Sequence, residues 1–272
     1  PQYRIERPDD LLLFAVPRKG SRNARIPNHF HRILEWLRVP PERVRLLAGK
    51  HLVRELRVAG QAEQLGILGP PEVYLDYLDE CMAHHDVLQG GGGIVYVTRA
   101  ELPTWKGRHA GEAYVTQKLH EAGVHVVVPE KLDVFRQLEI YAAADILIFA
   151  EGSAIHGRQL LGRLAQDIVV MARRNHERRH VEKLRQRCDK VTYWGVNDGM
   201  FSFPDPNTGV PAHWSAMMTY DLEALFYCFR HIGVELAQDW NMAEFEAARD
   251  ADLLEWLSMH TLHTKKFFAS AE

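Results

Sequence analysis

A short run of small and polar residues after the apolar stretch 145–150 has the composition of a phosphate-binding turn. Gly152 lets the backbone approach a ligand, Ser153 can cap a helix or bond a phosphate oxygen, and His156 can donate to a leaving phosphate. Ala154 keeps the turn small. If a strand ends at 150 and a helix begins near 156, free amides and the positive helix end face the strand edge. The run predicts a diphosphate site, although an ordinary capped strand-to-helix turn would have the same residues.

Arginines follow two of the apolar runs and supply the positive charge that a diphosphate requires. Arg99 comes directly after the run 94–98, and its guanidinium group can bind phosphate through two nitrogens. We therefore predict that Arg99 clamps the phosphates. Arg173 and Arg174 follow the run 167–171 and are expected to assist, but the basic stretch 173–180 is also typical of a solvated helix face.

These residues must be positioned by alternating strands and helices. From residue 94 onward, apolar runs predict buried strands, and stretches of helical period separate them. This alternation is typical of a doubly wound, mostly parallel sheet, which binds ligands at the carboxyl ends of its strands. The predicted strands are 94–98, 124–128, 145–150, 167–171 and 191–194, and the predicted helices are 110–122, 134–143, one opening near 156, and 176–187.

The N-terminal part predicts a smaller α/β unit, with strands at 11–16, 44–48 and 52–58 and helices at 27–37 and 70–85. The glycines Gly90 to Gly93 then predict a hinge or domain linker, or simply a flexible surface loop. A long helix at 241–262 ends the chain, with apolar residues for docking. We therefore expect an N-terminal lobe at 1–89, a C-terminal Rossmann-like lobe at 90–240 and a helical segment at 241–272.

Composition excludes several classes of protein. The chain of 272 residues is 46% hydrophobic and 25% charged, which predicts a globular protein rather than a disordered one. A net charge of −3 does not favour nucleic acid as a partner. Three distant cysteines without C-x-x-C spacing predict no disulfide framework and favour a cytoplasmic setting. No apolar run approaches the ~20 residues of a membrane span, and the start at Pro1 leads us to expect a piece of a longer protein.

The order of motifs between Ile94 and Gly157 resembles glycosyltransferase family 61. The resemblance rests on Tyr-Val-Thr-Arg at 96–99, Gly-Glu at 111–112, an apolar strand ending in Pro-Glu at 129–130, Arg-Gln-Leu-Glu at 136–139, and the run 151–156. Segments between 11 and 86 resemble the second half of the family's N-terminal lobe. Gly111 departs from the pattern, because the family usually has Asn there, and the front of the N-terminal lobe is missing or shortened.

This resemblance implies a GT-B fold of two facing Rossmann-like lobes, the N-terminal one truncated. It implies inverting transfer of a sugar without an obligate metal, from a nucleotide-sugar donor that is a substrate rather than a cofactor. The expected acceptor is a glycan or glycolipid, in the synthesis of a surface polysaccharide. Peripheral membrane association is expected only through a larger parent protein. The chain's lack of an Asp-x-Asp signature at a strand end agrees with a metal-free reaction.

Inverting transfer needs a general base to accept the acceptor's proton. Glu151 is a candidate, or it holds the ribose or sugar hydroxyls. Glu112 is a second candidate and Glu139 a candidate donor contact, although both could equally cap a helix or lie on the surface. From the N-terminal side of the cleft, His31 is a candidate base, together with its neighbours His29 and Glu35.

Other chemistries are less well supported by the sequence. The fifteen histidines form no H-E-x-x-H or similar set, so we expect no metal site. Asp250 and Asp252 lie in the predicted terminal helix, where a solvated acidic face is expected. Ser153 lacks the second glycine of a G-x-S-x-G nucleophile turn, which weakens the alternative of a phosphate-ester hydrolase. A non-catalytic nucleotide- or glycan-binding module of a larger protein remains the main alternative.

Two further regions are candidates for contacts with the rings of a substrate. Residues 129–132 lie where a nucleobase is expected, beyond the strand 124–128. An aromatic set could form a sugar or acceptor platform, or equally an apolar cluster under a long loop. This set is Tyr193, Trp194, Phe201, Phe203 and Trp214.

Overall fold

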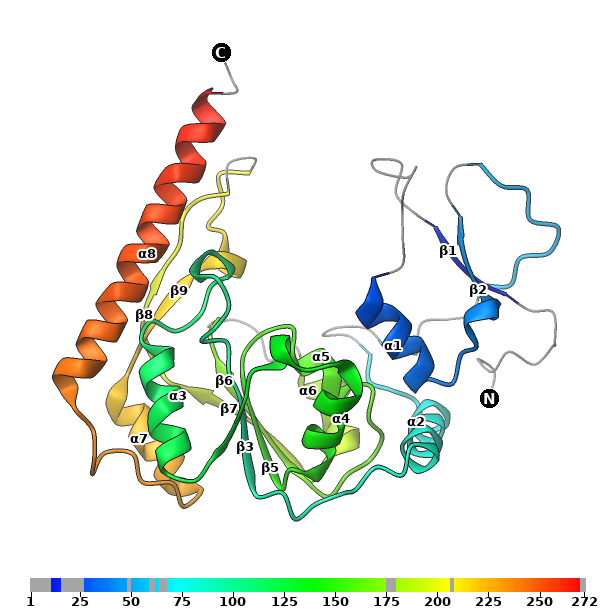
Figure 1. The fold of residues 1–272 in the computed structure, drawn as a ribbon, viewed down its shortest axis with the longest axis horizontal. Coiled ribbons are helices and arrows are strands. Elements are labelled where there is room, and N and C mark those ends of the chain that lie inside the picture. The colour runs from blue at the N-terminus through cyan, green and yellow to red at the C-terminus, as the bar shows by residue number, and fades with distance from the viewer. Residues whose placement is uncertain are drawn as a thin grey trace.

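The computed structural model describes residues 11–15, 27–47, 50–58, 62–63, 68–174, 180–205 and 208–269, with side chains up to 259. The described chain is a mixed α/β structure built around a five-stranded parallel sheet (Figure 1). Helices α3, α7 and α8 lie to one side of the sheet in this view, and the N-terminal segment lies to the other.

The central sheet contains the five strands that the apolar runs predict. They are β3 (Ile94–Val97), β4 (His125–Val127), β5 (Ile146–Ala150), β6 (Asp167–Ala172) and β7 (Lys190–Gly195). Every pair is parallel, in the order β4-β3-β5-β6-β7. The chain therefore proceeds from β3 to β4 on one side and then to β5 on the other. The crevice at the carboxyl ends of β3 and β5 is the topological switch point, where doubly wound sheets bind ligands.

Helices cover both faces of this sheet and enclose two apolar cores. One core receives α4 (Val134–Ala143) and the single turn α5 (Ile155–Arg158), and the other receives α3 (Glu112–Glu121) and α7 (Leu222–His231). The central strands β3, β5 and β6 are buried on both faces along most of their length, which explains why they are nearly continuous apolar runs. Near the amino edge, α6 (Val181–Leu184) and the 3₁₀ turn η5 (Arg185–Arg187) precede β7.

The N-terminal segment packs on this core. Strands β1 (Leu12–Ala15) and β2 (Val44–Leu47) pair in parallel, with α1 (Asn28–Trp36) and the 3₁₀ turn η2 (Pro41–Arg43) between them, and α2 (Glu72–His84) follows. Trp36 is fully buried in the core beside α4, and its indole nitrogen donates to the carbonyl of Leu160 at 2.8 Å. The predicted strand at 52–58 is wrong: this stretch is irregular, and its apolar side chains are exposed.

The glycine run before β3 is held in place rather than free. The amides of Gly91 and Gly93 donate to the two carboxylate oxygens of Asp145 at 2.8 and 2.9 Å, and Gly92 donates to the carbonyl of Ala143. A Cβ on Gly92 would lie 2.6 Å from that carbonyl oxygen, so the backbone approach itself requires glycine. These contacts argue against the predicted hinge, because the loop is bonded to the end of α4.

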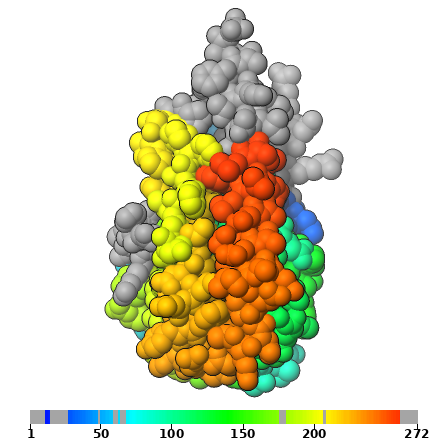
Figure 2. Space-filling view, turned by 90° about the vertical axis from the view of Figure 1, so that its left-hand side faces the viewer, coloured from blue at the N-terminus to red at the C-terminus, as the bar shows by residue number. Residues whose placement is uncertain are grey.

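The C-terminal part adds an antiparallel pair and one long helix. Strands β8 (Asn197–Phe201) and β9 (Met217–Tyr220) pair, and α8 (Met242–Ala269) runs along α3. Figure 2 shows α8 covering this side of the molecule beside the segment that contains β8 and β9. Phe245 and Trp256 of α8 are buried, as the docking prediction requires. Within the described residues, we find no helix that is both long enough and apolar enough to span a membrane.

Candidate functional site

The guanidinium group of Arg99 lies directly against Gly152 at the switch point of the sheet. A Cβ built on Gly152 would lie 2.0 Å from Nη1 of Arg99, so only glycine leaves room for this contact. Nε and Nη2 of Arg99 donate to the carbonyls of Lys106 and Gly107 at 2.9 to 3.2 Å. Burial lowers the pKa of Arg99, and the charge of Glu112 partly offsets this effect. The structure thus joins the two elements of the predicted phosphate site.

The turn after β5 is open to solvent and has free amides. Ser153 and His156 are exposed, and the amides of Gly152, Ser153 and Ala154 donate to no other residue in the part of the chain that the structure describes. The helix that follows is only the four-residue α5, and Ser153 does not cap it. The expected contribution of a helix dipole is therefore small, because few peptide dipoles are aligned. The free amides and Arg99 are the groups that can bind an anion here.

Glu151 anchors the ends of β5 and β6. Its Oε2 accepts from the amides of Arg173 and Arg174 at 2.7 and 2.9 Å, and its Oε1 accepts from Nε and Nη2 of Arg174 at 3.0 and 2.7 Å. Burial opposes ionisation, but the charge of Arg174 and the two amides outweigh it and lower the pKa of Glu151. A carboxylate with four hydrogen bonds and a lowered pKa is poorly suited to accept a proton, which disfavours Glu151 as the base.

Arg173 is the second buried guanidinium group of the site. Its Nη1 donates to the carbonyl of Ala216 at 3.1 Å and its Nη2 to that of Trp214 at 3.4 Å. A Cβ on Gly107 would lie 2.4 Å from Nη1 of Arg173, while the Gly107 carbonyl accepts from Arg99. Arg99 and Arg173 thus both contact Gly107. Burial first, and then the neighbouring charges of Arg99 and Arg174, lower the pKa of Arg173 to about 10.

Glu112 fixes the backbone of Arg99 from behind. It is fully buried at the start of α3, and its Oε1 accepts from the hydroxyls of Tyr96 and Thr98 and from the amide of Arg99 at 2.7 Å. No described residue donates to its Oε2. The hydrogen bond to the Arg99 amide makes Glu112 a positioning residue for Arg99. Its carboxylate is fully buried and has no contact with solvent in this structure.

His109 is a buried polar residue of this region that sequence reasoning missed. Its Nε2 lies 2.6 Å from Oδ1 of Asn197, and Nδ2 of Asn197 donates to the carbonyl of Ala172. Asn197 therefore accepts through Oδ1, and Nε2 of His109 carries the hydrogen. Burial lowers the pKa of His109, which leaves Nδ1 an acceptor without a partner in the described structure. A lone histidine between a turn and a helix offers no spacing signal that could have revealed this contact.

His180 is a second missed residue and lies beside the turn. Its ring meets that of His156 edge to face at 5.4 Å. Burial first, and then the nearby His156, lower its pKa to about 4. Sequence did not single it out, because the charged run 173–180 is typical of a solvated helix face.

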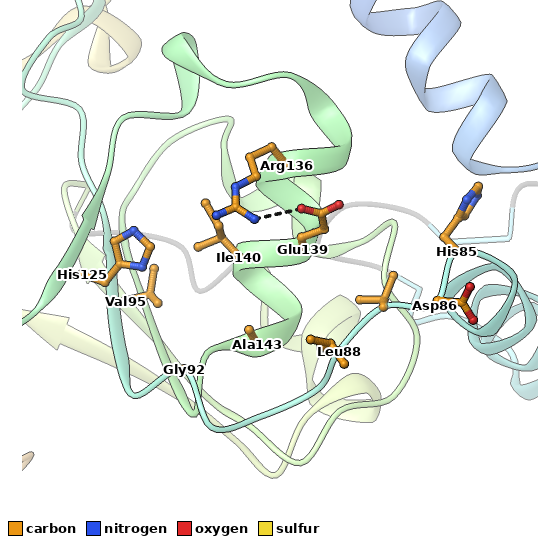
Figure 3. Close-up of a pocket in the computed structure, with 11 residues that line it drawn as sticks. His85, Asp86, Leu88, Gly92, Val95, His125, Arg136, Glu139, Ile140 and Ala143 are labelled. Carbon is orange, nitrogen blue, oxygen red and sulfur yellow. Dashed lines mark hydrogen bonds and ion pairs between the residues drawn. The ribbon is translucent and has the colours of Figure 1, made fainter.

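Two predicted site residues lie elsewhere. Glu139 is on the exposed face of α4, in an ion pair with Arg136 at 3.0 Å, and lines a cavity of about 340 Å³ at the amino ends of β3 and β4 (Figure 3). This is the opposite edge of the sheet from Arg99. His31 is exposed on α1, which packs against α4 and the turn η2. The structure therefore does not bring Glu139 or His31 to the Arg99 turn.

The site gathers three guanidinium groups. Arg99, Arg173 and Arg174 lie near the buried carboxylates of Glu112 and Glu151, and the exposed Glu130 also acts on the charge of Arg99. The two buried arginines, Arg99 and Arg173, donate mainly to backbone carbonyls, which do not neutralise them. Such a group of oriented donors can stabilise an anion. Among the described residues, no group of three or more His, Cys, Asp or Glu side chains is arranged to hold a metal ion.

Comparisons with known proteins add no family to this geometry. The sequence matches no model of a known protein family, and a search of curated proteins gives no relative. The functional argument therefore depends on the site itself.

Proposed function

We propose that this chain is a glycosyltransferase that moves a sugar from a nucleotide-sugar donor to a glycan or glycolipid acceptor. The observation that carries the proposal is the contact between Arg99 and Gly152 at the switch point of the parallel sheet. The resemblance to glycosyltransferase family 61 adds a GT-B arrangement, inverting transfer, independence of metal and a place in surface polysaccharide synthesis to this proposal.

The arrangement suits a diphosphate leaving group. When the bond between the sugar and the diphosphate breaks, negative charge grows on the phosphate oxygens, and donors that are already oriented stabilise it without reorganisation. The remaining hydrogens of Arg99 and the free amides of 152–154 meet this requirement. Because Nε and Nη2 of Arg99 are bonded to carbonyls, the guanidinium plane is fixed before a ligand arrives.

A second function, a non-catalytic module that binds nucleotides or glycans, is favoured by one specific observation. None of Glu151, Glu112 and His31 lies free beside the turn: Glu151 accepts four hydrogen bonds, Glu112 is fully buried, and His31 is exposed on α1, the helix that also carries His29 and Glu35. If another part of a longer protein supplies the base, this chain alone binds the donor but does not transfer its sugar.

The test is a thermal-shift and calorimetric screen of UDP, GDP, CMP and their sugars, since a ligand of the folded state raises apparent stability. We expect one nucleotide class to bind, and Arg99→Ala to abolish that binding. Arg230→Ala is the matched control, because Arg230 is exposed on α7 in an ion pair with Glu235. Unchanged affinity in folded Arg99→Ala would reject the clamp. Release of the nucleotide with transfer of the sugar to an added acceptor would distinguish the transferase from the binding module.

A further inference from the structure

The chain has six tryptophans, all of them described, and Trp214 is the most exposed. Its relative exposure is 56%, whereas three of the others are buried and two are partly buried. It belongs to the 3₁₀ turn η6 (His213–Ser215), between β8 and β9. A large aromatic ring in solvent at a fixed position is a suitable contact for a ligand.

The turn that carries Trp214 is fixed to the arginine cluster. Arg173 donates to the carbonyl of Trp214 and to that of Ala216, so the middle of the turn and the residue that follows it are bonded to the same guanidinium group. Ser215 is buried, and its carbonyl accepts from the indole nitrogen of Trp256 on α8 at 2.9 Å. The backbone that carries the indole of Trp214 is therefore fixed by Arg173, and the next residue, Ser215, is buried.

Three of the other four aromatic residues of the predicted platform pack inside the protein: Trp194 is buried against Phe229, Phe203 packs on Trp256, and Tyr193 packs against the core that contains α4. These three side chains form apolar clusters, whereas Trp214 and Phe201 are exposed. Of these two, Trp214 lies in the turn whose carbonyls Arg173 binds.

We propose that Trp214 stacks on the C–H face of a sugar ring at the site where Arg99 and the amides of 152–154 bind the diphosphate. The inference rests on the proposed function and adds a residue that determines its sugar specificity. β6, which Arg173 follows, lies on the opposite side of the switch point from β4 and residues 129–132. Consider a nucleotide sugar whose diphosphate lies at the switch point and whose base lies near β4. Its base is then directed away from Trp214, and its sugar is directed toward Trp214. A pyranose presents apolar C–H groups that make dispersion contacts with an indole face.

The same ring chemistry can come from the donor or from the acceptor, and the experiment distinguishes them. Trp214→Ala is compared with Tyr227→Ala, an exposed aromatic on α7, by calorimetry with UDP, UDP-glucose, UDP-N-acetylglucosamine, GDP and GDP-mannose. A second arm measures KM for oligosaccharide acceptors. We expect Trp214→Ala to weaken binding of the sugar nucleotide, or to raise the acceptor KM, by about tenfold, with unchanged affinity for the free nucleotide.

An equal loss of affinity for UDP or GDP alone would overturn the inference, because the ring would then contact the base. Unchanged binding in both arms would overturn it too. Failure of the wild-type chain to bind any nucleotide contradicts the proposed function itself, whereas nucleotide binding that Trp214→Ala leaves intact in every arm contradicts only the role of Trp214.

Discussion

Replacing Gly152 by Ala displaces the Arg99 guanidinium group without removing its charge. The added Cβ would lie 2.0 Å from Nη1 and 2.9 Å from Cζ, whereas carbon atoms and their neighbours pack at about 3.5 Å, so the group must move by about 1.5 Å. The φ of Gly152 is not positive, and the clashing atoms are the far end of a flexible side chain. We therefore expect the variant to fold, with a loss of stability of about 1 to 3 kcal/mol from the strained hydrogen bonds of Arg99 to the carbonyls of Lys106 and Gly107.

The expected loss is in affinity for the diphosphate. A charge-assisted hydrogen bond contributes about 1.5 to 3 kcal/mol, and a displacement of this size breaks at least one. This corresponds to a dissociation constant about 10 to 100 times higher for UDP or pyrophosphate, measured by calorimetry. Gly195→Ala is the matched control, because a Cβ there meets nothing within 4 Å. If Gly152→Ala binds both ligands as tightly as Gly195→Ala does, the assignment of this turn to phosphate is wrong.

Three further predictions concern stability and protonation. Because the pKa of Glu151 is lowered, the stability from its ion pair is present at neutral pH and is lost as pH falls below about 4.5; Glu151→Gln should therefore cost about 1 to 3 kcal/mol at pH 7 and much less in acid, by urea unfolding. His180 stays neutral in the folded state, so stability should fall as pH drops from about 6.5 toward 4; an NMR titration should place its pKa near 4, and a value near 6.5 would contradict its burial. Asp252→Ala should destabilise the fold by about 3 to 5 kcal/mol, because Asp252 binds Arg108 and the amide of Gly111, whereas Asp250→Ala, at an exposed site, should have little effect; equal effects would refute this role.

The parallel sheet could be predicted from the sequence because both of its faces are covered. Strands buried on both faces must be apolar throughout, so β3, β5 and β6 appear as uninterrupted runs. The same criterion failed at 52–58, where the apolar residues are exposed and pair with no strand of the described chain. Hydrophobicity alone does not reveal whether a neighbour is available for pairing. The antiparallel pair β8 and β9 was missed, because Asn197–Phe201 contains Asp and Gly and has no regular alternation.

Only the part of the candidate site that lies at the ends of strands could be predicted from the sequence. Arg99 and Gly152 lie at adjacent strand ends, so their meeting follows from the topology. Contacts over long sequence distances could not be predicted. Asp252, expected on a solvated acidic face, instead pairs with Arg108 and has a side chain only 13% exposed. Asp145 accepts from the amides of Gly91 and Gly93, in a glycine run for which the local sequence predicts a flexible loop.

The central claim is that the amides of Gly152, Ser153 and Ala154, together with Arg99, bind the phosphates of a nucleotide. The most direct measurement is an NMR titration of the isotope-labelled chain with UDP and GDP, following the backbone amides and the Arg99 side chain. We predict that saturable shifts are largest at these three amides and at Arg99, and that pyrophosphate shifts the same signals. Shifts centred on the cavity beside Glu139, or no shift at the turn while nucleotide binds elsewhere, would contradict this claim.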